Sequence, residues 1–284
     1  MPPLLSDITT RLASISDSPA LDASVLIAHI LNKPRTWVVA HPESTLTSEQ
    51  QDQLNTSLER LESGEPLPYV LGHWEFFGME FIVTPDVLIP RPETELLVEK
   101  ATAWLNRHPS QNRAVADVGT GSGAIAVSIA VNVPDSNILA TDISSQALQI
   151  ATQNAIYHGV DGKIDFMECD LLPRPPRDEL GARTLNLVCA NLPYIPTQTM
   201  LGLPIYGREP TLALDGGHDG FALIRKLMQI APNFLLPNSL MLLEIEASLG
   251  KQALQFAHAL LPNANIRLHK DLTGRDRLLE IQLP

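Results

Sequence analysis

Lysine and arginine are scarce in this sequence. Only 20 basic residues stand against 32 acidic ones, and the formal net charge is −12. A protein that holds a long stretch of duplex nucleic acid normally carries a basic stripe, because the phosphate backbone must be neutralised. The composition therefore argues against direct nucleic-acid binding and favours a protein or small-molecule partner. An acidic surface also attracts a basic partner.

Cysteine and long hydrophobic runs are scarce as well. The two cysteines, Cys169 and Cys189, lie in apolar, strand-like stretches without metal-ligand spacing. We expect buried free thiols, no metal site and a reducing cytoplasm. No apolar run approaches the roughly 18 residues that span a bilayer. The N-terminus also lacks the basic and apolar segments of a signal peptide. We therefore expect a cytoplasmic chain without a membrane segment.

The 284 residues suffice for one large or two modest domains. Up to about Gly64, apolar residues recur at helical spacing, and Thr47 with Gln50 forms a capping-box pattern. A glycine- and proline-rich segment follows, and the aromatic and β-branched residues of 73–83 predict a hairpin. The predicted organisation is a helical bundle over 1–66, a linker and hairpin over 67–90, and a further domain over 91–284.

From about Arg91 the sequence alternates between helical and strand patterns. This alternation predicts an α/β domain with a mostly parallel, three-layer sheet. In open sheets of this kind, ligands bind beyond the carboxyl ends of the strands. Segments beginning at Gly119, Asp142 and Asn191 fall at such ends. We predict strands at 114–118, 137–141, 163–168, 185–190, 239–245, 266–269 and 278–283, and helices at 94–105, 124–131, 144–158, 221–231 and 249–260.

A glycine-rich turn, Asp-Val-Gly-Thr-Gly-Ser-Gly at 117–123, follows a strand and opens a helix. Glycines permit a tight turn against which a ligand can lie. Asp142, at the end of the next strand, can accept hydrogen bonds from ribose hydroxyls. A nucleoside-containing cofactor is therefore favoured over a turn without a ligand. Both NAD and S-adenosylmethionine fit, but the spacing differs from the dinucleotide fingerprint and favours the methyl donor. The predicted cofactor residues are Gly119, Thr120, Gly121, Ser122, Gly123 and Asp142, then Asp170 and Leu171 for the adenine, although Asp170 could instead cap a turn.

Residues 191–194, Asn-Leu-Pro-Tyr, follow the fourth predicted strand beside this turn. An amide or aromatic amine nitrogen is a poor nucleophile because its lone pair is delocalised, and a general base helps it little. Two acceptors on its N–H groups localise the lone pair. Asn191 offers a side-chain carbonyl and Leu192 a backbone carbonyl, whose direction Pro193 restrains. Tyr194 offers a flat face for stacking. The segment predicts methyl transfer to a planar nitrogen; its plainer interpretation is a polar turn.

Further motifs extend over almost the whole chain, and with them the sequence resembles the release-factor glutamine methyltransferases, the PrmC/HemK family. The resemblance rests on the residues at 88–95, 117–126, 141–144, 147–148, 191–195, 209–210, 213–214, 216–217, 219–220 and 271–277. The Pro-Arg-Pro-Glu-Thr-Glu run at 90–95 and the Glu-Pro, Gly-Gly and Asp-Gly pairs at 209–220 are much more specific than the methyltransferase core.

The resemblance implies a seven-stranded class I methyltransferase (Rossmann-like) sheet behind a small N-terminal helical domain that binds the substrate. It implies methyl transfer from S-adenosylmethionine to the side-chain amide N5 of the glutamine in the Gly-Gly-Gln motif of class 1 peptide chain release factors. We expect a monomer. Residues carried over from the family are Gly119 to Gly123 and Asp142 for the cofactor, Asn191 for both cofactor and substrate, and Leu192, Pro193 and Tyr194 for the glutamine pocket. Arg91 and Thr94 would reach the methionine end of the cofactor or simply begin a helix.

The chain departs from the family at two places. Leu192 stands where the family usually has proline, which keeps the carbonyl but adds an N–H donor. We expect function to survive, because Pro193 still restrains Leu192. The family also tends to read Glu-Ile-Gly before a glutamine where this chain has Glu244-Ile245-Glu246 and Leu249, and these positions receive no site role.

Two rival functions use the same fold. Adenine-N6 methyltransferases acting on RNA or DNA can share Asn-Leu-Pro-Tyr, but those acting on ribosomal RNA usually carry a glutamate before the glycine-rich turn and a basic surface. This chain has Asp117 and a net charge of −12. A binding protein with an idle methyltransferase fold is the second rival, and the intact Asn191 and Asp142 argue against it.

Overall fold

The computed structural model describes residues 4–108, 113–173 and 184–284. The chain divides into two compact units, Met1–His73 and Trp74–Pro284. Helices α1 to α5 lie in the first unit, and the strands lie in the second apart from the first residue of β1. No helix within the described ranges is long and apolar enough to cross a membrane.

The first unit is a helical bundle, as predicted. Its helices are α1 (Leu4–Leu12), α2 (Pro19–Leu31), α3 (Arg35–Ala40), α4 (Ser48–Glu62) and α5 (Leu67–Leu71). The predicted capping box begins α4: Gln50 N donates to Thr47 Oγ1, and Thr47 N donates to Gln50 Oε1. These two bonds satisfy backbone donors that the first helical turn would otherwise leave unpaired. The buried side chains that hold the bundle together recur at helical spacing and include Ile8, Leu12, Leu26, Ile27, Leu54 and Leu58.

Helix α5 is tied to the end of α4 by one arginine. The guanidinium of Arg60 donates to the carbonyls of Tyr69 and Val70 at 3.0 and 3.2 Å. It also pairs with Glu65 at 2.5 Å, so the segment after α4 folds back onto it. The compact unit extends to His73, and these bonds keep α5 with the bundle.

Strands β1 (His73–Phe76) and β2 (Met79–Ile82) form the predicted hairpin. Phe77 and Gly78 occupy its two-residue turn with φ of 54° and 70°. Positive φ at both central positions matches the right-handed twist of the flanking strands. The rings of Phe76 and Phe81 are buried in the core of the second unit, so the hairpin is packed onto that unit.

One buried side chain fastens the hairpin to the glycine-rich turn. Asn154 lies in α8 (Ser145–Tyr157) and is fully buried. Its Oδ1 accepts a bond from Ile82 N at 2.7 Å. Its Nδ2 donates to Ile82 O at 3.0 Å and to Ser122 O at 2.8 Å. The amide thereby connects β2, α8 and the turn between β3 and α7.

Seven strands form one mixed sheet in the order β5-β4-β3-β6-β7-β9-β8, which confirms the predicted fold class. They are β3 (Arg113–Val118), β4 (Ser136–Asp142), β5 (Ile164–Glu168), β6 (Leu185–Ala190), β7 (Leu235–Glu244), β8 (Asn265–Lys270) and β9 (Asp276–Gln282). Strands β3 to β7 run parallel, and β8 and β9 form the predicted antiparallel pair at one edge. The chain adds β4 and β5 on one side of β3 and then β6 on the other. At such a reversal the loops after β3 and β6 diverge and leave a crevice for ligands.

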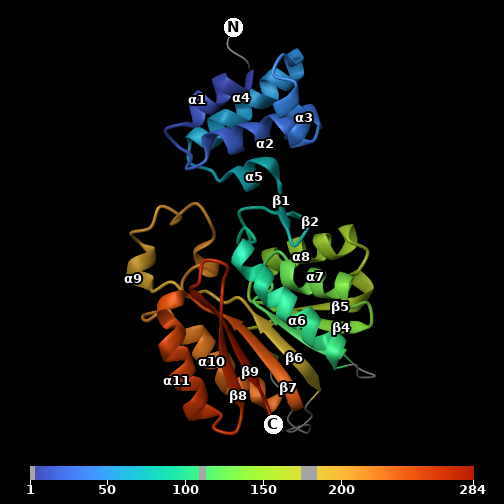
Figure 1. Cartoon of the computed structure of the whole chain (residues 1–284), viewed down its shortest axis with the longest axis vertical. Helices are drawn as coiled ribbons and strands as arrows, with labels where there is room; N and C mark the ends of the chain where they lie inside the picture. The colour runs from blue at the N-terminus through green and yellow to red at the C-terminus, as the bar shows by residue number, and fades with distance from the viewer. Residues whose placement is uncertain (1–3, 109–112, 174–183) are drawn as a thin grey trace. The chain divides into compact units, whose positions relative to one another are not determined.

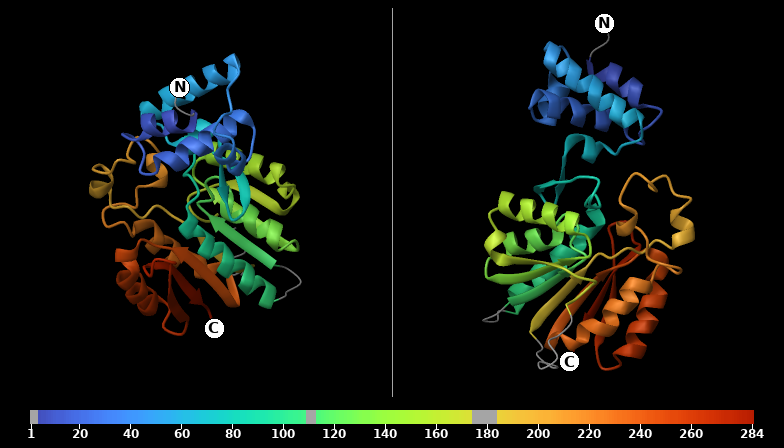
Figure 2. Two further views of the ribbon diagram at one scale, coloured as in Figure 1. Left: turned by 45° about the horizontal axis from the view of Figure 1, so that its top comes forward. Right: turned by 180° about the vertical axis from the view of Figure 1, so that it is seen from behind.

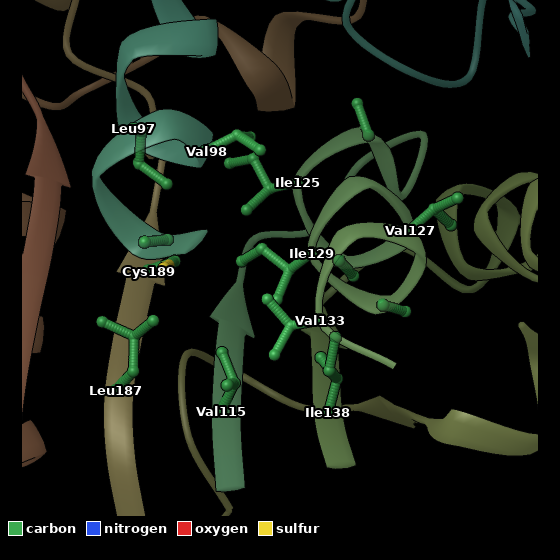
Figure 3. Packing of buried hydrophobic residues seen from close by; sticks show 14 of the residues in the cluster. Leu97, Val98, Val115, Ile125, Val127, Ile129, Val133, Ile138, Leu187 and Cys189 are labelled. Atoms are coloured by element: carbon green, nitrogen blue, oxygen red, sulfur yellow. The ribbon is translucent and has the colours of Figure 1, made fainter. Parts of the chain in front are cut away.

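Helices cover both faces of this sheet (Figure 1), and Figure 2 shows the same division from behind. Helices α6 (Glu95–Arg107), α7 (Ala124–Asn132) and α8 cover one face, and α10 (Ala222–Ile230) and α11 (Gly250–Leu260) cover the other. On the first face, Val115 lies below Ile129 and Val133, and Leu187 lies on the neighbouring strand below Leu97 of α6 (Figure 3). A second apolar cluster fills the opposite face. Burying each such side chain contributes about 1.5–3 kcal/mol, so the sheet is held rigidly from both sides.

Strand β7 begins four residues before the position expected from the sequence. Pro237 and Asn238 signal a turn, and the pattern therefore predicts a strand only from Ser239. In the structure Asn238 has a φ of 60° within the strand, and its N–H donates to Pro284 O at 3.1 Å. Leu235 already pairs with Leu185, and the register shifts before the regular pairing resumes. The turn residues are accommodated as an irregularity inside the strand.

Asn154→Ala removes three hydrogen bonds at once and leaves buried backbone groups without partners. We expect it to lower the free energy of unfolding by roughly 2–4 kcal/mol, since each buried group left unpaired costs about 1–3 kcal/mol. Urea denaturation measures the change. Gln153→Ala, at the exposed neighbouring position of α8, is the matched control and should stay within about 0.5 kcal/mol of wild type. Equal stability of the two variants would contradict the proposed role of Asn154.

Candidate active site

A cavity of about 320 Å³ in the second unit is lined by residues that follow β3, β4, β5 and β6. Its volume lies in the range of small-molecule sites. Nearly all of the residues singled out from the sequence meet in its wall: Arg91, Thr94, Gly119, Thr120, Gly121, Ser122, Asp142, Asp170, Leu171, Asn191, Leu192 and Pro193. The lining does not include Gly123 and Tyr194.

The glycine-rich turn needs its glycines for two different reasons. Gly119, Gly121 and Gly123 all have positive φ, at 72°, 56° and 81°, which other residues rarely adopt. A Cβ at Gly121 would meet no protein atom within 4 Å, so the space beside it belongs to the cavity. A Cβ at Gly123 would lie 3.1 Å from Cα and Cβ of Ala151. Gly123 therefore allows α7 and α8 to pack closely and does not line the cavity.

Asp142 joins two segments of the cavity wall. It ends β4, where its Oδ2 accepts a bond from Gly121 N and its Oδ1 from Ser144 N, both at 2.9 Å. Ser144 is the N-cap of α8, as predicted, and its hydroxyl accepts from Ala147 N. Each carboxylate oxygen retains acceptor capacity after one backbone bond. The carboxylate can therefore accept further hydrogen bonds from a ligand in the cavity.

Asp117 holds the same turn from below. This carboxylate at the end of β3 is fully buried, and its Oδ2 accepts from Thr120 Oγ1 at 2.6 Å and from Ala126 N at 3.1 Å. Burial raises the pKa of Asp117 to about 7, although the two hydrogen bonds act in the opposite direction. The turn is thus fixed by a carboxyl group whose charge is costly to bury.

The residues after β5 form a third part of the wall. Leu171 has a φ of 68°, and its carbonyl accepts from Thr141 Oγ1 at 2.6 Å. Asp170 pairs with Lys226 at 2.5 Å, and both side chains are about half exposed. Cys189 is a buried free thiol, as expected, but Cys169 is only partly buried and lines the cavity directly after β5. The expectation of two buried thiols is therefore wrong for Cys169, because this residue follows the last residue of β5, Glu168, and borders the cavity.

Asn191 takes part in a network that the sequence analysis did not foresee. Its Nδ2 donates to Thr94 Oγ1 at 2.9 Å, and Thr94 Oγ1 donates to Glu244 Oε2 at 2.7 Å. Tyr194 Oη donates to Glu244 Oε1 at 3.5 Å. Glu244, which received no site role from the sequence, is 1% exposed and ends β7. A charged residue at the carboxyl end of an otherwise apolar strand was the available signal.

The segment 191–194 is held by close packing from two sides. Leu192 is buried, and its Cδ2 lies 2.9 Å from the position that a Cβ of Gly119 would occupy. On the other side, a Cβ at Gly216 would lie 2.7 Å from Cα of Tyr194 and 2.8 Å from the carbonyl oxygen of Pro193. The chain also bonds directly here, since Gly216 N donates to Ile195 O at 2.8 Å. Gly216 thus lets the chain pass against this segment, whereas a Cβ at Gly217 would lie 3.0 Å from Cβ of Ala222.

Arg91 brings the two most specific sequence runs together. Its Nη2 donates to Glu209 Oε1 at 2.5 Å, across 118 residues of sequence. Glu209 is 7% exposed, and its Oε2 also accepts from Ile89 N at 3.2 Å. The structure also supports helix initiation here, because Pro92–Thr94 form a 3-10 turn directly before α6. The sequence alone gave no reason to pair Glu209 with Arg91.

Two family models match the chain. One, described as the PrmC N-terminal domain, covers residues 3–72, and the other, described as the methyltransferase small domain, covers residues 93–199. The chain is 38% identical over 275 residues to a release factor glutamine methyltransferase of Moorella thermoacetica, covering 96% of this chain and 95% of that protein. It is 40% identical over 243 residues to a release factor glutamine methyltransferase of Coxiella burnetii, with 84% and 83% covered.

A solved structure carries the same fold in its core. The SAM dependent methyltransferase from Agrobacterium tumefaciens matches with a TM-score of 0.52 and 13% sequence identity. The match covers 75% of this chain and 70% of that one. At this identity the likeness extends to the fold alone.

Gly216→Ala tests the packing behind residues 191–194. The added methyl group would press on backbone atoms of Pro193 and Tyr194, which cannot move aside as a flexible side chain would. We expect a loss of about 1–3 kcal/mol in unfolding free energy, measured by urea denaturation. Gly162→Ala is the control, because a Cβ there meets nothing within 4 Å. A Gly216→Ala protein as stable as this control would contradict the proposed constraint.

Asp117→Asn tests the buried carboxyl group. Its folded pKa of about 7 lies above the ordinary 3.8, so its stabilising contribution is complete below about pH 4 and is lost as the pH rises through about 7. Between these limits, the stability of the variant relative to wild type should rise by on the order of 4 kcal/mol. Urea denaturation across this range measures the difference, with Asp165→Asn at an exposed position of β5 as control. A difference that stays constant with pH would show that Asp117 does not titrate as described.

Proposed function

The chain belongs to the release factor glutamine methyltransferases, and we propose on that premise that it methylates N5 of a glutamine side chain in a peptide chain release factor. The proposed target is the glutamine of the Gly-Gly-Gln motif in class 1 release factors, and the proposed methyl donor is S-adenosylmethionine. The observation that carries the proposal is the position of Asn191, whose amide lies in one cavity wall with the turn 119–122. The side chain proposed to bind the substrate and the turn proposed to bind the cofactor therefore border the same cavity.

The cavity suits the proposed cofactor in size and in the groups it presents. Its volume is about 320 Å³, and the missing side chain at Gly121 leaves room for a ligand against the backbone. The Asp142 carboxylate would accept hydrogen bonds from ribose hydroxyls. When bound there, S-adenosylmethionine supplies an electrophilic methyl group on a sulfonium. The residues proposed to hold it are Gly119, Thr120, Gly121, Ser122, Gly123, Asp142, Asp170, Leu171, Asn191, Arg91 and Thr94.

Gly123 and Arg91 support this set differently from the rest. Gly123 lies behind the wall, so its proposed contribution is the shape of the turn and not a direct contact. Arg91 lines the cavity, but its guanidinium is already paired with Glu209. Its proposed role is to hold the run 88–91 in the wall while retaining free N–H donors, since a guanidinium has five.

Residues 191–194 are proposed to bind the substrate glutamine. The carboxamide nitrogen has two N–H donors, and the side-chain carbonyl of Asn191 and the backbone carbonyl of Leu192 would accept them. This arrangement localises the nitrogen lone pair and fixes its direction. Held in this way, the nitrogen would accept the methyl group that the cofactor supplies, and one amide proton would leave to water. Pro193 would restrain Leu192, and Tyr194 would offer a flat face to the planar amide.

Tyr194 is suited to contact and not to proton transfer. Burial and the nearby Glu244 raise the pKa of its hydroxyl well above its ordinary value, so the phenol stays protonated. The ring lies outside the cavity lining, directly after Pro193, which belongs to it. Its proposed stacking contact would therefore be made with a side chain that enters from the rim.

The remaining proposals concern the partner and the setting. We propose that the helical region 1–66 contacts the release factor, that 67–90 links it to the rest, and that 91–284 carries out the transfer. The net charge of −12 supports a protein substrate and no direct nucleic-acid binding. A monomeric, cytoplasmic enzyme without membrane attachment fits a substrate of the translation machinery.

Incubation of the chain with S-adenosylmethionine and a class 1 release factor tests the function. Mass spectrometry should find one added methyl group on the glutamine of the Gly-Gly-Gln peptide. Asn191→Ala should lower turnover by at least ~100-fold, because one preorganised acceptor is lost, and should reduce cofactor affinity less. Methylation of RNA or DNA in parallel reactions, with an unmodified release factor, would overturn the proposal in favour of adenine methylation.

A further inference from the structure

Hydrogen bonds join three buried or half-buried side chains, Asn191, Thr94 and Glu244, the last of which ends β7. The Nδ2 of Asn191 donates to Thr94 Oγ1, and Thr94 Oγ1 donates to Glu244 Oε2, at 2.9 and 2.7 Å. Thr94 and Glu244 are 4% and 1% exposed. They come from three separate parts of the chain, since Thr94 lies 97 residues before Asn191 and 150 residues before Glu244. This chain of bonds is called the Asn191–Thr94–Glu244 relay below.

The direction of the relay follows from the number of protons each group carries. A carboxylate only accepts, and a threonine hydroxyl has a single proton. Thr94 must therefore donate that proton to Glu244, which leaves only a lone pair for Asn191. The asparagine can meet a lone pair only with its NH₂ group. Its carbonyl oxygen, the only acceptor of the side chain, is then left for a ligand.

Without this constraint the two ends of the amide are nearly interchangeable in shape. If Thr94 were free to donate toward Asn191, the amide could turn over and present NH₂ to the cavity. A substrate carboxamide presents its own NH₂ there, so two donors would face each other without an acceptor. The loss would be that of one acceptor in a preorganised site.

We propose that Glu244 and Thr94 are positioning residues that fix the orientation of the Asn191 amide, so that its carbonyl oxygen and not its NH₂ group meets the substrate nitrogen. This inference rests on the proposed function. It assigns Thr94 a role toward Asn191 in addition to its place in the cavity wall. It gives Glu244 a function although no atom of Glu244 lines the cavity.

The surroundings of Glu244 make the relay sensitive to pH. Burial raises the pKa of Glu244 to about 7, and Glu93 adds to this, whereas Thr94, Arg277 and Tyr194 lower it. Arg277 is itself paired with Asp271 at 3.4 Å. A protonated carboxyl can donate to Thr94, and the hydroxyl is then free to donate to Asn191. Turnover that depends on the relay should therefore fall as the pH drops through about 7.

The same shift has the opposite sign for stability. A carboxyl group with a raised folded pKa stabilises the fold in its protonated form, and this contribution is lost as the pH rises through about 7. Ionised Glu244 is therefore costly to the fold and useful only to the orientation of Asn191. If the carboxyl group acted only through stability, turnover and stability would both be highest at the pH where the group is protonated.

Two substitutions at Thr94 separate the hydroxyl from the shape of the side chain. Thr94→Val keeps the branched shape but breaks the relay, and we expect kcat for release factor methylation to fall by ~100-fold. Thr94→Ser restores the hydroxyl and should recover most of that loss. Equal kcat in the two variants would overturn the proposal. Isothermal titration with S-adenosylmethionine measures the cofactor affinity of each variant, and urea denaturation measures its folded fraction. Each kcat is corrected for both.

Glu244→Gln tests the pH dependence of kcat, which a purely structural role of Glu244 would leave unchanged. A glutamine amide can either accept a hydrogen bond from Thr94 or donate one to it, so the direction of the relay is no longer fixed. Because the amide does not titrate, the direction also no longer changes with pH. We expect a kcat between those of wild type and Thr94→Val above pH 8, and no decline with a midpoint near pH 7. A Glu244→Gln protein that keeps both wild-type kcat and the wild-type decline would overturn the proposal.

The double variant Thr94→Val with Glu244→Gln completes the cycle. Because the two residues act in series on Asn191, it should lose no more kcat than Thr94→Val alone. Losses that multiply would show independent effects and would overturn the relay. Failure of the proposed function looks different: wild-type protein would then leave the release factor unmethylated at every pH.

Discussion

The turn after β3 and the side chain of Leu192 are in close contact, because a Cβ at position 119 would lie 2.9 Å from Cδ2 of Leu192. This close approach joins the turn after β3 to the segment after β6. The strand order makes it possible, since β3 and β6 are neighbours although β4 and β5 come between them in the chain. The two loops leave the sheet in different directions, and Leu192 closes the gap at their base. The cavity wall is continuous at this point for that reason.

Close packing also explains the glycines at 216 and 220. Residues 191–194 cannot shift toward β3, because Leu192 already touches the turn. They cannot shift away either, since Gly216 packs against the backbone of Pro193 and Tyr194. Gly220, with a φ of 72°, packs there as well, because a Cβ at this position would collide with the carbonyl oxygen of Tyr194. The segment is therefore held by steric contact on both sides.

Two buried carboxyl groups, Asp117 and Glu244, add polar constraints at the ends of β3 and β7. Burial raises the pKa of each to about 7. A leucine at either position would suit the surrounding core better, because burying a charge is unfavourable unless it is fully paired. Both carboxyl groups instead fix polar atoms that line the cavity: the hydroxyl of Thr120 in one case and that of Thr94 in the other. The two carboxyl groups lower the stability of the fold, but they fix the arrangement of hydrogen-bond donors and acceptors in the cavity wall.

Much of this arrangement follows from local sequence patterns. The capping box at Thr47, the strand at 185–190 and the glycine-rich turn are set by neighbouring residues, and the structure confirms them. The pairs Arg91–Glu209 and Thr94–Glu244 could not be predicted, because residues 118 and 150 positions apart meet only once the sheet order is known. Leu192 shows the same limit. The sequence points to its backbone carbonyl, while the contact of its side chain with Gly119 depends on the neighbouring positions of β3 and β6.

An acceptor pair alone does not distinguish a glutamine amide from an adenine amino group, because both present two N–H donors on a planar nitrogen. Discrimination must come from the rest of the wall. Leu88 and Pro90 on one side and Pro210, Leu212 and Ala213 on the other line the same cavity. They belong to the two runs most specific to the family, and the bond between Arg91 and Glu209 holds those runs together. The chemistry common to planar nitrogens and the features particular to this family thus occupy different parts of one cavity wall.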